Sequence, residues 1–220
     1  ADEAQEIAAK VGLQRKVWVA GSIGPTSKSL SLSPDVADPA FRPYSFEQMK
    51  EAYRLQAEAL LKGGADLLLI ETCFDALNVK AALAGIQEIV RERLLTTQVP
   101  SQLSWAPPPS RGWQNASSVI QPLPEIPPVM ISVSVGDRSG RTLTGQTLEA
   151  FYTSVCHYPI LTFGLNCSLG AAELMPLVEE IDKWCRCGVS CYPNAGLPNE
   201  MGGYDQSPED MAAQIKAMAS

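Results

Sequence analysis

Two kinds of apolar pattern alternate along this chain. Short apolar runs typical of buried strands lie at residues 17–20, 66–70, 129–135, 160–166 and 188–192. Each run is followed, directly or after a loop, by a stretch in which apolar residues recur every three or four positions, as on one face of a helix. Strands that alternate regularly with helices predict a parallel sheet covered by helices.

Polar residues mark where several of these helices begin. Ser45, Thr147 and Ser207 are candidate N-caps, because their hydroxyls can accept hydrogen bonds from the first free amides of a helix. Pro208 directly after Ser207 suits the first helical turn. The helix that begins after Ser207 has an apolar face of Met211, Ile215 and Met218. Further helices are indicated by apolar faces alone, formed by Ile7, Ala8 and Val11; Val79, Leu83, Ile86 and Val90; Leu174, Leu177, Val178, Ile181 and Trp184.

The number of strand–helix units limits the architecture. An eight-stranded barrel usually needs about 250 residues, and the chain has 220. Five units therefore predict an α/β fold that is either an open sheet or a barrel that lacks some of its strands.

Residues 94–128 break the pattern. They contain Pro107-Pro108-Pro109 and further prolines, without any sustained period. A structureless segment of this length is unusual inside a compact domain. We interpret residues 94–128 as a disordered insertion; a proline-rich ligand for a partner domain and translated non-coding sequence are the alternatives.

Composition excludes several classes of protein. The net charge is −7 and the chain has no basic cluster, so we expect no nucleic-acid partner. No apolar stretch approaches the roughly 18 residues that span a bilayer, and the start lacks a secretory signal. We expect a cytoplasmic protein in which the six cysteines are reduced. Cys185, Cys187 and Cys191 lack the usual zinc spacing, so we expect buried structural thiols there.

The candidate chemistry lies where predicted strands end. Cys167 follows one strand and is either a zinc-bound or nucleophilic thiolate or a small buried hydrophobe. Glu71 ends another strand, where it could hold a substrate ammonium or act as a base, or serve in a salt bridge. Asn166 and Asn194 also end strands and could bind a carboxylate or fix a loop. The single histidine, His157, follows a predicted helix, which gives little support to histidine-based triads.

Several long motifs occur in an order that resembles one family, the homocysteine-binding module of cobalamin-dependent methionine synthase. They are Val19-Ala20-Gly21-Ser22-Ile23-Gly24-Pro25-Thr26, Ser33-Pro34-Asp35-Val36, Asp38-Pro39-Ala40-Phe41, Gly64-Ala65-Asp66-Leu67-Leu68-Leu69-Ile70-Glu71-Thr72, Arg141-Thr142-Leu143-Thr144-Gly145-Gln146-Thr147, Gly164-Leu165-Asn166-Cys167 and Pro193-Asn194-Ala195-Gly196-Leu197-Pro198-Asn199. The resemblance covers the whole chain except the proline-rich insertion. Residues 33–36 and 141–147 favour the cobalamin-dependent branch over the branches that use betaine or S-methylmethionine.

The resemblance implies a (β/α)8 TIM barrel, present here in part as about strands 3 to 7 in one domain over residues 1–220, incomplete at both ends. It implies zinc bound by three cysteines. The first matches Cys167, and the other two belong to a Gly-Gly-Cys-Cys motif that this chain lacks. Glu71 matches the acid on the substrate side, Asn194 an amide beside the metal, and Asn166 a position of less defined role that we take as substrate-binding.

The implied reaction is methyl transfer from methylcobalamin to homocysteine, which gives methionine. Zinc would make the substrate thiol a thiolate at neutral pH, while cobalamin and folate would be bound by other domains. Because two zinc ligands are missing, we expect this chain alone to be inactive; a variant in which Cys191 replaces a ligand stays open. The alternatives are a betaine- or S-methylmethionine-dependent methyltransferase and a non-catalytic fragment.

Overall fold

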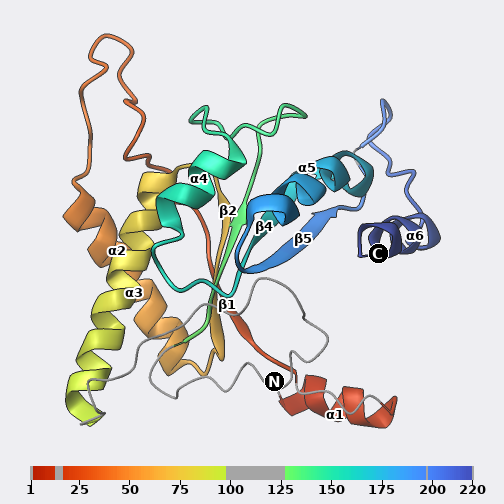
Figure 1. The fold of residues 1–220 in the computed structure, drawn as a ribbon, viewed down its shortest axis with the longest axis horizontal. Coiled ribbons are helices and arrows are strands. Elements are labelled where there is room, and N and C mark those ends of the chain that lie inside the picture. The colour runs from red at the N-terminus through yellow and green to blue at the C-terminus, as the bar shows by residue number, and fades with distance from the viewer. Residues whose placement is uncertain (1, 13–16, 98–126, 197, 220) are drawn as a thin grey trace.

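The computed structural model describes residues 2–12, 17–97, 127–196 and 198–219. Within them, five parallel strands form one sheet in the order β1-β2-β3-β4-β5 (Figure 1). The strands are β1 (Ala20–Ile23), β2 (Leu67–Cys73), β3 (Val129–Val133), β4 (Thr162–Gly170) and β5 (Gly188–Asn194). The helices are α1 (Asp2–Lys10), α2 (Phe46–Lys62), α3 (Ala76–Thr97), α4 (Leu148–Val155), α5 (Ala171–Trp184) and α6 (Pro208–Met218).

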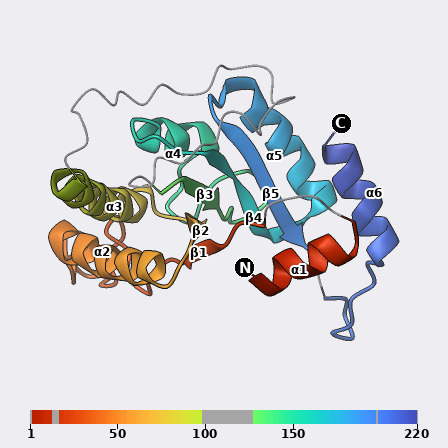
Figure 2. The same cartoon turned by 90° about the horizontal axis from the view of Figure 1, so that it is seen from below.

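Strands and helices alternate as predicted, and the α/β fold with part of a TIM barrel is confirmed. Sequential strands are neighbours in the sheet, and helices α2 to α6 lie along an arc outside the strands (Figure 2). This arrangement is that of consecutive βα units of a barrel.

The first strand was predicted three residues too early. We expected it at residues 17–20, but it runs from Ala20 to Ile23. The register explains the shift: Ala20 pairs with Leu67, the first residue of β2, while the Val19 carbonyl accepts the amides of Asp66 and Leu67 before the ladder begins. Pairing with β2, rather than local hydrophobicity, therefore sets the limits of β1.

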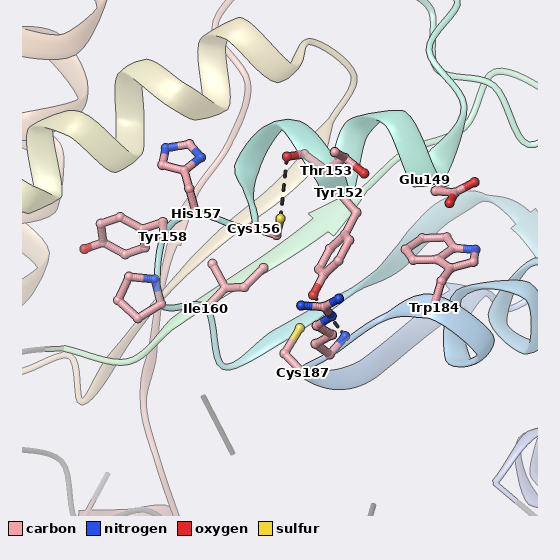
Figure 3. Close-up of a pocket in the computed structure, with 11 residues that line it drawn as sticks. Glu149, Tyr152, Thr153, Cys156, His157, Tyr158, Ile160, Trp184 and Cys187 are labelled. Carbon is pink, nitrogen blue, oxygen red and sulfur yellow. Dashed lines mark hydrogen bonds between the residues drawn. The ribbon is translucent and has the colours of Figure 1, made fainter. Parts of the chain in front are cut away.

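The two faces of the sheet differ in chemistry. On the helix-facing side, seven side chains of β2, β3 and β4 are at most 2% exposed: Leu68, Ile70, Val129, Ile131, Val133, Phe163 and Leu165. The centroid of the Phe163 ring lies 5.2 Å from the ring centroid of Tyr152 in α4 and 6.2 Å from that of Trp184 in α5. Figure 3 shows Tyr152 and Trp184. Because successive residues of a strand point to opposite faces, the positions between these apolar residues line the concave side, and many of them are polar.

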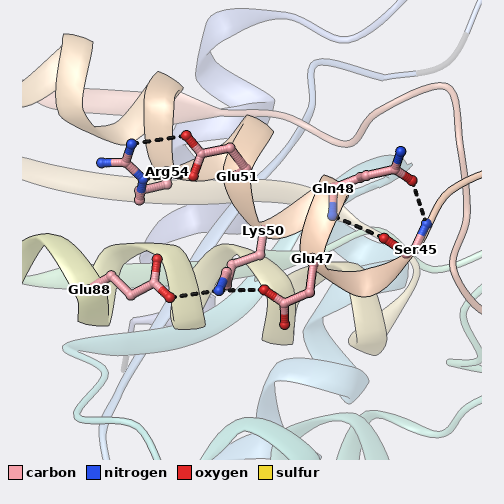
Figure 4. Close-up of polar contacts among 7 residues, drawn as sticks. All are labelled: Ser45, Glu47, Gln48, Lys50, Glu51, Arg54 and Glu88. Atoms are coloured by element: carbon pink, nitrogen blue, oxygen red, sulfur yellow. Dashed lines mark hydrogen bonds and ion pairs between the residues drawn. The ribbon is translucent and has the colours of Figure 1, made fainter.

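Helices α2 and α3 pack closely outside β1 and β2. Ser45 forms a capping box with Gln48, as its predicted N-cap role requires (Figure 4). Lys50 Nζ lies 2.6 Å from Glu47 and 2.6 Å from Glu88 of α3 (Figure 4). Gly85 allows the close approach, because a Cβ there would lie 2.9 Å from the Lys50 carbonyl oxygen. Ion pairs near a protein surface contribute little to stability, so the buried core carries most of it.

The terminal helices are less buried than their patterns suggest. Ile7 of α1 is 54% exposed, and in α6 no side chain is fully buried, although Met218 packs against the core. Residues 94–97, which we expected to belong to the insertion, continue α3. Pro128, at the other end of the predicted insertion, accepts the Leu68 amide directly before β3, and residues 98–126 lie outside the described residues. Among the described helices, none combines the length and the apolar character that a membrane span needs.

Candidate functional site at the carboxyl ends of the strands

Three residues with a left-handed backbone mark the carboxyl ends of β2 and β4. Thr72, Cys167 and Ser168 have φ angles of 60°, 48° and 64°, and they are the non-glycine residues with positive φ in the described part of the chain. The strand pairing shifts register at both places. Such a conformation costs about 1–2 kcal/mol per residue, and strain of this kind concentrates at functional sites. Tertiary contacts must therefore hold these residues in place.

Asn166 supplies many of those contacts. Its side-chain oxygen accepts hydrogen bonds from the Thr72 amide at 3.1 Å and from Ser132 Oγ at 2.7 Å. Its Nδ2 donates to Thr72 Oγ1 at 3.0 Å and to Cys167 Sγ at 3.3 Å. The residue is 4% exposed, and these four bonds use the full capacity of an amide group. The geometry supports the loop-fixing alternative for Asn166, and substrate binding by this residue stays a prediction.

Polar groups surround the thiol of Cys167. Besides Asn166, Ser134 Oγ lies 3.5 Å from Cys167 Sγ, and Ser134 also bonds to Ser168 Oγ at 2.6 Å. Cys167 is half-buried. These contacts do not resemble those of a small hydrophobe in packed hydrocarbon. The Asn166 amide is an oriented donor to the sulfur, and in the contact with Ser134 either atom could be the donor.

The Glu71 carboxylate joins three strands on the concave side. It accepts hydrogen bonds from Ser22 Oγ of β1 and from the Tyr192 hydroxyl of β5, the latter at 3.0 Å. Burial, together with the negative charge of Glu71, raises the pKa of Tyr192 above its usual range. Tyr192 therefore stays protonated and donates to the carboxylate throughout the physiological pH range.

Asn194 lies at the same end of the sheet. It is the last residue of β5 and pairs with Gly170, the last residue of β4. The four predicted site residues therefore lie toward the carboxyl ends of their strands, as predicted. In a parallel sheet these ends share one edge.

Cys191 is placed differently, and its predicted variant role is wrong. Its side chain lies on the helix-facing side of β5, where it lines a cavity with Met175 of α5 and Ile215 of α6. Burial raises its pKa to about 11. Because neighbouring Tyr192 points to the concave side and successive strand residues alternate, Cys191 cannot share a metal ion with Cys167.

The described residues do not complete a metal site. No three histidine, cysteine, aspartate or glutamate side chains gather around a common point in this part of the chain. The kind of donor at Cys167 suits zinc, but zinc sites use three or four protein ligands. Cys167 by itself therefore does not make a zinc site.

Sequence reasoning missed four residues of this site: Ser22, Thr72, Ser134 and Tyr192. Tyr192 precedes Asn194 by two positions, so strand alternation alone could have placed it on the same face. Ser22 stands in a Gly-Ser-Ile-Gly segment, which resembles a phosphate loop only superficially. Nothing in the sequence indicates the left-handed backbone of Thr72.

The fold and the polar site at the carboxyl ends of its strands are those of a barrel enzyme. Three solved structures share the fold, all of the homocysteine methyltransferase MmuM from Escherichia coli. The apo form is 20% identical, with a TM-score of 0.61 over 99% of this chain and 70% of that one. The metallated form is 19% identical, with a TM-score of 0.60 over 100% and 59%. The oxidised form is 17% identical, with a TM-score of 0.51 over 98% and 66%.

The family model for homocysteine S-methyltransferase matches residues 1–220. The chain belongs to the homocysteine S-methyltransferase family, and it spans between 59% and 70% of the length of those solved structures.

Proposed function

We propose that this chain is the homocysteine-binding module of a cobalamin-dependent methionine synthase, which methylates homocysteine to methionine with methylcobalamin as the donor. Membership of the family supports the acceptor. The donor rests on residues 33–36 and 141–147, which resemble the cobalamin-dependent branch. Cobalamin-binding and folate-binding domains are the partners that this assignment requires.

One observation carries the proposal: the Asn166 amide connects the thiol of Cys167 with the strand end that bears Glu71. Asn166 donates to Cys167 Sγ and binds both the amide and the hydroxyl of Thr72, the residue after Glu71. A sulfur ligand and a carboxylate are thus fixed on the same edge of the sheet. An amino-acid substrate with a thiol needs a carboxylate for its ammonium group and a metal ligand near its sulfur.

The proposed roles follow from these positions. Glu71 binds the ammonium group of homocysteine, with Ser22 and Tyr192 orienting its carboxylate. Asn166 orients the thiol of Cys167, and Asn194 lies beside the substrate at the end of β5. Cys167 contributes one thiolate to zinc, and the remaining ligands come from outside the described residues. Bound zinc would lower the pKa of the substrate thiol and so favour its thiolate.

The two segments that indicate the donor lie in loops that extend from the carboxyl ends of the strands. Residues 33–36 belong to the loop between β1 and α2, and residues 141–147 to the loop between β3 and α4. Thr144 Oγ1 donates to the Phe74 carbonyl oxygen at 2.8 Å, directly after β2. Loops at this face surround the active site in barrel enzymes, so both segments lie where a methyl donor would approach.

A donor assay tests the proposal on the full-length protein. Homocysteine is supplied with methylcobalamin, S-methylmethionine or betaine, and methionine is measured. We expect methionine with methylcobalamin, and we expect Cys167→Ser to lower the rate by at least about 100-fold, the upper range for loss of a metal-site interaction. Cys156→Ser is the matched control. Cys156 is exposed and lies at the end of α4, not at the carboxyl ends of the strands. Turnover only with betaine or S-methylmethionine would show that the protein belongs to the branch that uses that donor. No turnover with any donor would support the non-catalytic alternative.

A zinc titration of the 220-residue chain tests whether its own residues are enough to bind zinc. With a chromophoric chelator as competitor, we expect no stoichiometric tight binding, because one thiolate cannot satisfy a four-coordinate ion. Tight binding at one zinc per chain, lost in Cys167→Ser, would show that residues of this chain complete the site.

A further inference from the structure

A second group of cysteines lies at the opposite end of the sheet from the candidate active site. A cavity of about 680 Å³ opens there between the end of α4 and the turn that connects α5 to β5 (Figure 3). Tyr152, Cys156 and His157 line it on one side, and Arg186 and Cys187 line it on the other. Because β5 begins at Gly188, this cavity lies at the amino ends of the strands.

Two thiols are in contact at this place. Cys185 Sγ and Cys187 Sγ are 3.3 Å apart, and both side chains are half-buried. We expected buried thiols here, but α5 ends at Trp184 and Cys185, its C-cap, is half-buried. The Arg186 amide donates to the Tyr152 hydroxyl at 2.9 Å, which fixes the turn between the two cysteines.

The two thiols are not equivalent. The thiol of Cys187 hydrogen-bonds to Cys185, and this bond is the main cause that lowers the pKa of Cys185 to about 7, against the effects of burial and of Asp182. The Tyr152 hydroxyl also lowers it. The same contact, with burial, raises the pKa of Cys187. The contact therefore favours the thiolate of Cys185 over that of Cys187.

We propose that Cys185 and Cys187 form a reversible dithiol–disulfide pair that reacts with small-molecule disulfides. Cys187 lines the cavity, and Cys185 Sγ lies 3.3 Å from Cys187 Sγ. In the first step, the Cys185 thiolate attacks one sulfur of the disulfide, an S–S bond forms to Cys185, and one thiolate leaves and takes up a proton. In the second step, Cys187 loses its proton and attacks Cys185 Sγ, which releases the second thiol. The protein dithiol loses two electrons and the small disulfide gains them.

The backbone permits this bond. The Cα atoms of residues two apart are at most about 7 Å from each other, and disulfides span Cα separations of about 4.4–6.8 Å. The sulfur atoms must approach from 3.3 Å to about 2.05 Å. Half-exposed, closely spaced thiols of this kind are typical of reversible rather than structural disulfides.

The chain has a matched set of variants for the test. The 220-residue protein is incubated with glutathione disulfide at pH 7, quenched with acid, alkylated and mapped by mass spectrometry. We expect a disulfide within the peptide that carries residues 185–187, reversed by dithiothreitol. Cys187→Ser should stall as a glutathione adduct on Cys185, because the resolving thiol is missing. Cys185→Ser should lose the fast reaction, and Cys156→Ser, which removes another thiol of the same cavity, should behave like the parent.

Alkylation rates test the same pair without any substitution. The contact between the two thiols lowers the pKa of Cys185 and raises that of Cys187, and the thiolate is the form that reacts. Cys185 should therefore react with iodoacetamide at pH 7 faster than Cys187, which is also half-buried. The proposal is overturned if Cys185 reacts no faster than Cys187, if no 185–187 disulfide forms in the parent, or if Cys187→Ser shows no adduct on Cys185.

Discussion

The Tyr192 hydroxyl of β5 donates a 3.0 Å hydrogen bond to the carboxylate of Glu71 in β2, across the concave side of the sheet. Two strands, β3 and β4, lie between them in the sheet. Only a strongly curved sheet brings side chains of β2 and β5 into contact. The bond is therefore direct evidence that the sheet is curved as in a barrel. It also orients a carboxylate that we propose to bind the substrate ammonium group.

Tyr192→Phe should weaken homocysteine binding while the fold is kept. Loss of one hydrogen bond to a partly exposed carboxylate is expected to cost about 1 kcal/mol, or about a fivefold rise in KM for homocysteine. The rate constant kcat should change less, because the hydroxyl orients Glu71 and does not touch the transferred methyl group. Steady-state kinetics of the full-length enzyme measure both constants.

Tyr204→Phe is the control for that experiment. Tyr204 is 67% exposed and lies in the segment between β5 and α6, so its loss of a hydroxyl should leave KM unchanged. An unchanged KM in Tyr192→Phe as well would contradict the proposed role of Glu71.

Asn166→Ala should destabilise the chain. The substitution leaves the Thr72 amide without its acceptor and removes one of the two partners of Ser132 Oγ, which also bonds to Tyr192. Together with the loss of the other two bonds of Asn166, this costs about 3 kcal/mol. At roughly 2–4 °C per kcal/mol for a chain of this size, Tm should fall by roughly 6–12 °C. Thermal unfolding followed by circular dichroism measures the change.

Asn194→Ala is the matched control, because Asn194 also ends a strand but is only half-buried. Its Tm should change by less than about 3 °C, the effect of a loss below 1 kcal/mol. Equal losses in the two variants would show that Asn166 does not fix the site in the way its contacts indicate.

Gly164→Ala should prevent folding. A Cβ at Gly164 would lie 1.7 Å from the Ser190 carbonyl oxygen, and the backbones of β4 and β5 would have to separate. We expect a loss above about 4 kcal/mol, seen as insoluble protein or as the absence of a cooperative unfolding transition. Gly24→Ala is the control, since a Cβ there meets nothing within 4 Å. A soluble Gly164→Ala protein with the Tm of the parent would refute the observed β4–β5 register.

The sequence predicted the parts of this fold that depend on local pattern. Buried apolar runs gave the strands, and Ser45, Thr147 and Ser207 were placed correctly as N-caps because each accepts an amide in the first turn. Glu71 and Cys167 were predicted to lie where strands end, and parallel strands end on the same side of a sheet. These features follow from residue type and spacing alone.

Other features depend on contacts between distant parts of the chain. The limits of β1 follow from its register with β2, and the partners of Glu71 follow from the curvature of the sheet. The left-handed backbone of Thr72 is held by Asn166, 94 positions later. No local propensity indicates such contacts, so the sequence predicted the candidate residues but not the network that orients them.

Asp75→Asn should make stability depend less on pH. Asp75 is 2% exposed and accepts hydrogen bonds from Ser29 Oγ, Ser31 Oγ and the amides of Ser31 and Leu77. Burial alone would raise its pKa, but these bonds outweigh burial and the pKa is lowered from 3.8. A carboxylate with a lowered pKa stabilises the fold at pH values above its unfolded pKa. That contribution is lost as the pH falls through the lowered value.

The parent should therefore be more stable than Asp75→Asn by about 2 kcal/mol at pH 7, the range for hydrogen bonds to a charged group. The difference should stay constant down to about pH 5 and shrink below about pH 4. Urea unfolding at a series of pH values measures it. Asp35→Asn is the control, because Asp35 is exposed and accepts one amide, that of Ala37, which asparagine can also accept. If the gap between parent and Asp75→Asn widened toward low pH, the loop between β1 and α2 would not be held by an ionised Asp75.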